Sequence, residues 1–291
     1  MEREISYPEG SLVFEEKSDG LTLVRVIGNF TEVNIPEKPD GEAIVTSVSK
    51  KAFLGRKTIK KIVLPDTVRS VGDWCFASCV NLASVRMPVC TAGEGIFNGC
   101  TLLEQIILPG ISGDMGYLLA GAVRYGAPPH LTDIRNIEAD RFEKWDAWVL
   151  RLLGEPDDEG FTNQILCGEE DYGSCDKDAY ESGRRVLKVS LCLLRLLHPE
   201  NIRDEDRERM SGYIRDHREG SDKGNESWIA VRDHFPDKKH FDMLASLGCI
   251  DDTNRDRMLR GLGDDKQELK SLLIKTSGSD AGDRFFSALE L

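Results

Sequence analysis

The 291-residue sequence has no long hydrophobic run. Its most apolar stretch, residues 186–197, is interrupted by Lys188, Ser190 and Arg195, and it is too short to cross the ~30 Å hydrocarbon core of a bilayer. The first residues also lack the basic and apolar segments of a secretory signal. From these absences we expect no membrane insertion and a cytoplasmic location.

Signatures of catalysis and of phosphate binding are missing as well. The sequence has no Gly-Lys-Ser/Thr loop, no Gly-x-Ser-x-Gly and no His-Glu-x-x-His. Zinc ligands usually come as close pairs of Cys or His, and His234 and His240 stand six residues apart around Pro236. We therefore expect no metal, no cofactor and no enzymatic activity.

Basic residues are too few to balance the acidic ones, and the formal net charge is −13. Residues 1–110 hold 12 basic and 14 acidic side chains, whereas residues 111–291 hold 26 and 37. An acidic surface of this kind repels phosphate backbones and anionic lipid headgroups. Binding to nucleic acid is therefore not expected, and the partner we expect is a protein whose identity the sequence does not specify.

Eight cysteines are present without an export signal, so we expect free and mostly buried thiols in a reducing compartment. Two of them, Cys167 and Cys175, match no repeat position; the first precedes an acidic stretch over residues 169–178 and the second lies within it. The stretch carries the five carboxylates Glu169, Glu170, Asp171, Asp176 and Asp178. Their spacing is not that of a calcium loop, and whether residues 169–178 bind a cation stays open.

The first part of the chain contains an internal repeat. Three sets of residues recur at steps of 23 and 21 positions, namely Phe53, Phe76 and Phe97, then Ile59, Leu82 and Leu103, then Pro65, Pro88 and Pro109. Each unit ends in an apolar alternation of period two, which predicts a short strand closed by proline. One unit cannot bury its own apolar edge, so the units are expected to stack into a solenoid with a parallel sheet.

The repeat, Val-x-x-x-Ala-Phe-x-Gly-Cys-x-x-Leu-x-x-Ile-x-Leu-Pro, resembles the BspA-type bacterial leucine-rich repeats. Residues 21–36 are similar to the N-terminal entry of that family, and Arg56 stands where the family usually has Cys. The resemblance covers about residues 8–110. It implies a leucine-rich repeat domain with an N-terminal capping unit over residues 1–110, serving as an adhesin or an interaction surface.

Beyond residue 110 the apolar period changes to that of a helix. Apolar residues recur at steps of three and four up to Leu197, where His198 and Pro199 end the helix, and residues 204–217 read as its partner. Shorter helices are expected around residues 241–247, 253–262 and 269–273. We predict an all-α domain of stacked helical hairpins over residues 111–291, loosely ankyrin-like and similar to the helical tails of uncharacterised bacterial leucine-rich repeat proteins. The whole chain is then an α+β repeat protein.

Strand alternation also predicts a binding face. With Ile62 and Leu64 pointing inward, the flanking positions point outward on the concave face of the sheet. The repeat register then gives six candidate partner-binding residues, Lys61, Val63, Ser84, Arg86, Gln105 and Ile107.

The function we expect is that of a non-catalytic protein–protein interaction scaffold in an unknown pathway. Two alternatives remain open. The first is a cysteine-dependent enzyme or regulator centred on residues 167–178, because a thiol can be activated by a histidine distant in sequence. The second is an exported adhesin, as the family resemblance implies. The sequence does not specify the oligomeric state.

Overall fold

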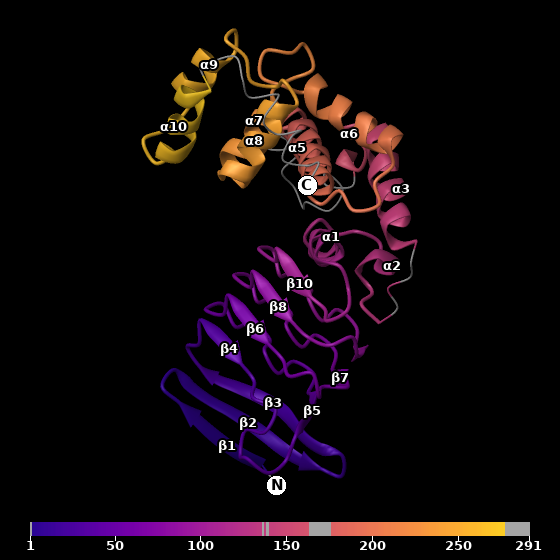
Figure 1. The fold of residues 1–291 in the computed structure, drawn as a ribbon, viewed down its shortest axis with the longest axis vertical. Coiled ribbons are helices and arrows are strands. Elements are labelled where there is room, and N and C mark those ends of the chain that lie inside the picture. The colour runs from indigo at the N-terminus through magenta and orange to yellow at the C-terminus, as the bar shows by residue number, and fades with distance from the viewer. Residues whose placement is uncertain (1, 136, 138–139, 163–175, 277–291) are drawn as a thin grey trace. The chain divides into compact units, whose positions relative to one another are not determined.

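The computed structural model describes residues 2–135, 137, 140–162 and 176–276. It divides into two compact units, Met1–Arg141 and Phe142–Leu291. The first is built from strands and ends in two helices, and the second is helical (Figure 1). The predicted α+β repeat fold, a leucine-rich repeat solenoid with a parallel sheet followed by helical hairpins, is confirmed.

An antiparallel meander opens the first unit, with β1 (Glu2–Tyr7), β2 (Gly10–Lys17) and β3 (Gly20–Gly28) paired in order. Its apolar side is buried, including Leu12, Phe14, Leu21 and Leu23. Strand β3 then pairs in parallel with β5 (Val45–Val48), the first strand of its row in the solenoid. The meander therefore closes the N-terminal end of the repeat core, as a capping unit must.

The solenoid carries two rows of short parallel strands (Figure 1). One row is a four-stranded sheet of β4 (Glu32–Asn34), β6 (Lys61–Val63), β8 (Ser84–Arg86) and β10 (Gln105–Ile107). The other continues from β3 through β5, β7 (Ser70–Val71) and β9 (Thr91–Ala92). Each turn of the chain contributes one strand to each row, so residues one repeat apart lie side by side.

The repeated phenylalanines form a ladder inside the solenoid. The ring of Phe76 lies 5.3 Å from that of Phe53 and 5.3 Å from that of Phe97, measured between centroids. All three side chains are buried. Each ring therefore packs against its equivalents in the neighbouring turns, which is why a phenylalanine is needed at the same place in every unit.

A second ladder ties each turn to the one before it through a polar contact. The thiol of Cys79 donates to the carbonyl of Phe53 at 3.0 Å, and the thiol of Cys100 donates to that of Phe76 at 3.1 Å. In the first unit Arg56 holds this position, and its guanidinium donates to the carbonyl of Val26. The unusual arginine thus supplies the same kind of bond, with the longer reach that a larger unit requires.

Helix α1 (Gly113–Arg124) covers the last strand of the solenoid, and α2 (Pro129–Thr132) follows it in the same unit. Gly116 lies against β10 so closely that a Cβ there would stand 2.4 Å from the carbonyl oxygen of Ile106. Met115, Leu118 and Leu119 are buried. The change from strand to helix thus comes after residue 110, whereas the compact units divide after Arg141, because α1 completes the repeat core.

This cap predicts how the first unit can be shortened. We expect a fragment of residues 1–141 to fold and a fragment of residues 1–110 to lose its cooperative unfolding transition, because the apolar edge of β10 is then exposed. Far-UV circular dichroism during thermal unfolding measures the difference. Equal cooperativity in the two fragments would show that α1 is dispensable.

The second unit is a set of helices of unequal length. It contains α3 (Arg141–Gly154), α5 (Lys177–Leu197), α6 (Asp204–Asp216), α7 (Glu226–Ile229), the π-helical turn η1 (Ala230–His234), α8 (Lys238–Ser246), α9 (Arg255–Arg260) and α10 (Gln267–Lys275). Helix α5 ends at Leu197, before His198 and Pro199, and packs against α6, as the sequence predicts. It also packs against α7 and α8, so α5 is the central helix of this unit.

The core of the second unit contains an ion pair as well as apolar side chains. Arg195 of α5 is fully buried, and its Nε lies 2.5 Å from Oδ1 of Asp146 on α3. The guanidinium also donates to the carbonyls of His198 and Glu200, and it lies 5.3 Å from the ring centroid of Phe142.

In the described part of the chain, no helix has the length and apolarity needed to cross a membrane.

Candidate functional site

The four-stranded sheet places the six predicted binding residues in two rows. Strand register aligns Lys61 with Ser84 and Gln105, and it aligns Val63 with Arg86 and Ile107. The residues between them, Ile62, Val85 and Ile106, are completely buried. The side chains of the two rows therefore lie on the outer face of the sheet, which we call the sheet face. Their role in binding a partner stays a prediction.

Arg86 occupies the middle of its row and is held in place. Its guanidinium lies 2.9 Å from a carboxylate oxygen of Asp66 and donates to the carbonyl of Leu64 at 3.3 Å. The hydrogen bond from Arg86 lowers the pKa of the Asp66 carboxyl. Ile107 beside it remains 38% exposed although it is apolar. The row thus offers a positioned cation between two aliphatic side chains.

Two hollows lie on another part of the repeat unit. A cavity of about 620 Å³ is bordered by Asp73, Trp74, residues 92–98 and the segment from Ala122 to Arg135. A smaller one of about 340 Å³ is bordered by Lys51, Leu54, Trp74, Ala77, Ser78, Asn98 and Gly99. Sequence reasoning missed Trp74, which borders both, because an isolated tryptophan breaks no periodicity and matches no motif.

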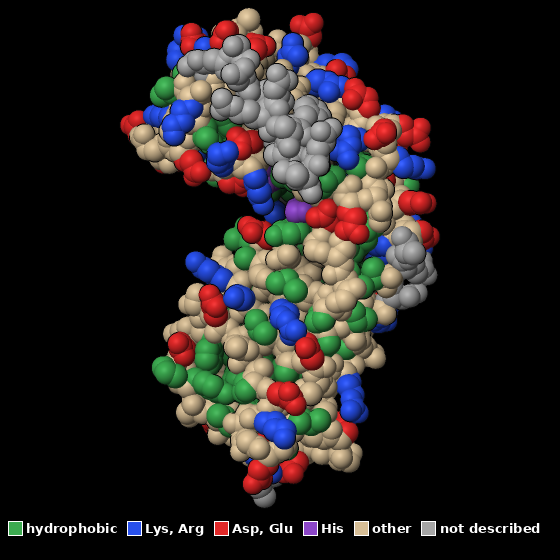
Figure 2. Space-filling model, in the orientation of Figure 1, with side chains coloured by type: hydrophobic (Ala, Val, Ile, Leu, Met, Phe, Trp, Pro, Cys, Tyr) green, Lys and Arg blue, Asp and Glu red, His purple; other side chains and the backbone are tan. Residues whose placement is uncertain are grey.

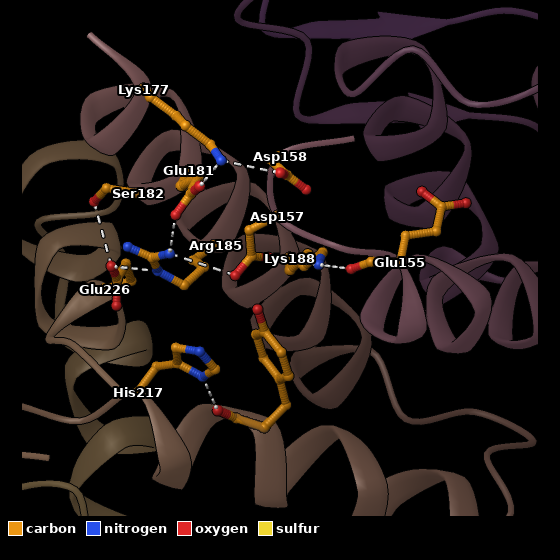
Figure 3. Close-up of polar contacts among 11 residues, drawn as sticks. Glu155, Asp157, Asp158, Lys177, Glu181, Ser182, Arg185, Lys188, His217 and Glu226 are labelled. Carbon is orange, nitrogen blue, oxygen red and sulfur yellow. Dashed lines mark hydrogen bonds and ion pairs between the residues drawn. The ribbon is translucent and has the colours of Figure 1, made fainter. Parts of the chain in front are cut away.

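The helical unit contains a cluster of charged side chains, which sequence reasoning also missed (Figure 3). Nε of Arg185 donates to Oε1 of the buried Glu226 at 2.8 Å. Nζ of Lys188, also buried, donates to Asp157 at 2.7 Å and to the carbonyl of Glu155 at 2.6 Å. These bonds join α5 to α7 and to residues 155–157. Buried charges must be paired to be tolerated, so the cluster acts as a polar core that holds these segments together.

The cysteine-centred alternative falls on residues that the structure describes only in part. Cys167, Cys175, Glu169, Glu170 and Asp171 lie outside the described residues. Asp176 is the N-cap of α5, where its carboxylate accepts from the backbone N–H of Ala179 at 3.1 Å. Among the residues that the structure does describe, no group of three or more His, Cys, Asp or Glu is placed to hold a metal ion.

The six described cysteines are free, and five of them are buried. Burial raises the pKa of Cys249 and of Cys100 to about 12, and that of the half-buried Cys90 to about 11. The thiolate is the form that reacts. We expect these six thiols to resist iodoacetamide at neutral pH while the protein is folded, and to react in urea. Mass spectrometry of the labelled peptides measures each one, and fast labelling of any of them in the native protein would contradict their placement.

Charge is distributed unevenly between the two units. On the face drawn in Figure 2, charged side chains crowd the surface of the helical part, whereas hydrophobic ones are frequent over the repeat part. This agrees with the concentration of acidic residues beyond position 110 in the sequence. The less charged repeat surface is better suited to burial against another protein, because fewer charged side chains have to be desolvated.

Comparison with known proteins identifies the repeat. Residues 27–116 match the family model of the BspA type leucine rich repeat region, in six copies. A leucine-rich repeat protein of T. pallidum is 27% identical over 37% of this chain and 50% of its own, with a TM-score of 0.33. One from Bacteroides capillosus is 20% identical over 37% of this chain and 99% of its own, with a TM-score of 0.28. The chain thus spans half the length of the T. pallidum protein.

A leucine rich cell surface protein from Faecalibacterium prausnitzii is 15% identical over 37% of this chain and 43% of its own, with a TM-score of 0.20. No curated protein matches the chain. The family match coincides with the turns of the solenoid and includes all three phenylalanines of the ladder. Residues 27–116 therefore match the BspA type leucine rich repeat region in sequence and form the solenoid in the structure, and the helical part follows them in the chain.

Proposed function

We propose that the protein is a non-catalytic interaction scaffold that binds a protein partner through the sheet face. The observation that carries this proposal is the row formed by Val63, Arg86 and Ile107. It is a short stripe of aliphatic side chains around an arginine already held by Asp66. Arginine with adjoining apolar surface is typical of the residues that dominate binding energy at protein interfaces. Because Arg86 is already ordered, little conformational entropy remains to be lost on binding.

Crosslinking with mass spectrometry in the native host identifies the partner, and the purified pair is then titrated. We expect Arg86→Ala and Ile107→Ala each to weaken binding by at least ~1 kcal/mol, about fivefold in Kd. Folding should be unchanged, because neither side chain is in the core. Arg69→Ala and Leu102→Ala are matched controls, since both residues are exposed and lie outside the four strands. Wild-type affinity in both test variants would place the interface elsewhere.

The same proposal assigns the protein to a reducing compartment such as the cytoplasm. Support comes from the six described cysteines, which are free thiols, since paired cysteines prevail in oxidising compartments. Cell fractionation, with the thiols trapped by alkylation at lysis, tests this assignment. Recovery of disulfide-linked protein outside the cell would favour the adhesin alternative.

A further inference from the structure

Trp74 occupies a backbone conformation that does not suit it. Its φ is +58°, in the left-handed region, which is uncommon for a bulky residue. The equivalent positions in the neighbouring units, Lys51 and Gly95, have φ of +61° and +58°, so the turn imposes this conformation and glycine satisfies it. The indole nevertheless remains 45% exposed. Folding alone therefore does not account for a tryptophan here, and strained residues of this kind concentrate at binding sites.

Trp74 borders both hollows of the repeat unit. The larger, at about 620 Å³, is within the usual size of a ligand pocket. Gly95 places no side chain against the ring, since a Cβ there would stand 3.5 Å from the indole. An open aromatic wall in a concave site can stack on a planar group.

Charge in the larger hollow is predominantly negative. Three carboxylates border it, those of Asp73, Glu94 and Asp133, against the single guanidinium of Arg135. Arg135 is paired with Asp133, to which its Nε and one Nη donate at 2.8 and 2.7 Å. Oδ1 of Asp73 accepts the backbone N–H of Glu94 at 2.8 Å. Among the described residues, no cation pairs with Asp73 or Glu94, so two carboxylates at the border of the hollow are available to a positively charged ligand.

We propose that the larger hollow, here named the Trp74 site, binds an arginine side chain of a partner polypeptide, with the guanidinium stacked on the indole and hydrogen-bonded to Asp73 and Glu94. Arginine fits better than lysine because its planar fork can stack on an aromatic ring and pair with carboxylates at the same time. The site lies outside the sheet face, and its test does not depend on whether the sheet face binds a partner.

Lys51 also lies over the Trp74 ring. Its Nζ lies 5.5 Å from the centroid of the Trp74 ring, so the indole already attracts one cation of the chain itself. Lys51 is exposed, and it borders the smaller hollow. Its charge repels an incoming guanidinium. Replacing it with a neutral residue of similar length should therefore strengthen arginine binding.

The full-length protein is titrated with the peptide acetyl-Ala-Ala-Arg-Ala-Ala-amide while the indole N–H signals are followed by NMR. The chain has four tryptophans, and Trp145, Trp148 and Trp228 are buried in the helical unit. The Trp74 signal is identified by its loss in Trp74→Phe. We expect a saturable shift of this signal. The peptide with citrulline in place of arginine, which keeps the shape and removes the charge, should bind at least about fivefold more weakly.

Four variants of the chain complete the test. Asp73→Asn and Glu94→Gln should each weaken binding of the arginine peptide, and Lys51→Gln should strengthen it, by about threefold in each case. Trp74→Gly should abolish binding while leaving the melting temperature unchanged or higher, as Gly95 holds the same conformation. The proposal is wrong if the citrulline peptide binds equally well, if no saturable shift occurs, or if Lys51→Gln weakens binding.

Discussion

Replacing Phe76 with alanine should lower the free energy of unfolding of the repeat unit by about 3–5 kcal/mol. The ring is fully buried and stacks between Phe53 and Phe97, each 5.3 Å away. Its removal takes away contacts with two turns at once and leaves a cavity that the short, interlocked strands cannot close. Urea denaturation of the full chain measures the loss of stability. Hydrogen exchange of peptides from the repeat unit shows that the loss occurs in this unit and not in the helical one.

Two variants make this result specific. Phe76→Leu should lose less than half as much stability as Phe76→Ala, because leucine fills most of the buried volume. Leu102→Ala removes an apolar side chain that is 50% exposed, and it should change stability by less than about 0.5 kcal/mol. An unchanged denaturation midpoint for Phe76→Ala would mean that the repeat register, and with it the row of Val63, Arg86 and Ile107, is wrongly assigned.

Replacing Asp146 with alanine should destabilise the helical unit by about 3–5 kcal/mol. The change leaves the guanidinium of Arg195 buried without its carboxylate, at a place where water does not reach either group. The two remaining bonds, to the carbonyls of His198 and Glu200, do not neutralise the charge. Urea denaturation followed by tryptophan fluorescence in a Trp74→Phe background reports on this unit, because the three remaining tryptophans, Trp145, Trp148 and Trp228, all lie in it.

An exposed pair serves as the control for Asp146. Lys270 and Asp264 lie 3.1 Å apart, with the Asp264 side chain fully in solvent, so Asp264→Ala should cost no more than about 1 kcal/mol. Asp146→Asn, which keeps the shape and removes the negative charge, separates loss of charge from loss of packing. A loss in Asp146→Ala as small as that in Asp264→Ala would show that Arg195 finds water or another partner in the folded state.

The sequence by itself determined the repeat and its register, because these rest on contacts between equivalent positions in neighbouring turns. Phe53, Phe76 and Phe97 recur where the ladder needs them, and the alternation around Ile62 defines which side chains face outward. Helix α5 was also predictable, since its apolar period and the terminating Pro199 are local. The sequence also shows Arg56 in place of the usual cysteine, although only the structure shows its hydrogen bond to the carbonyl of Val26.

Tertiary structure decided the features that depend on pairs far apart in the chain. The Arg195 and Asp146 pair spans 49 positions, and the Arg185 and Glu226 pair spans 41. No periodicity marks such partners, because each pair occurs once. The place of α1 in the repeat unit follows from the fit of Gly116 against β10, and the Trp74 site from a turn geometry shared with Gly95. Contacts between repeats recur, so the residues that make them recur in the sequence and can be identified there. A contact that occurs once leaves no such pattern, and its two residues are identified only in the folded structure.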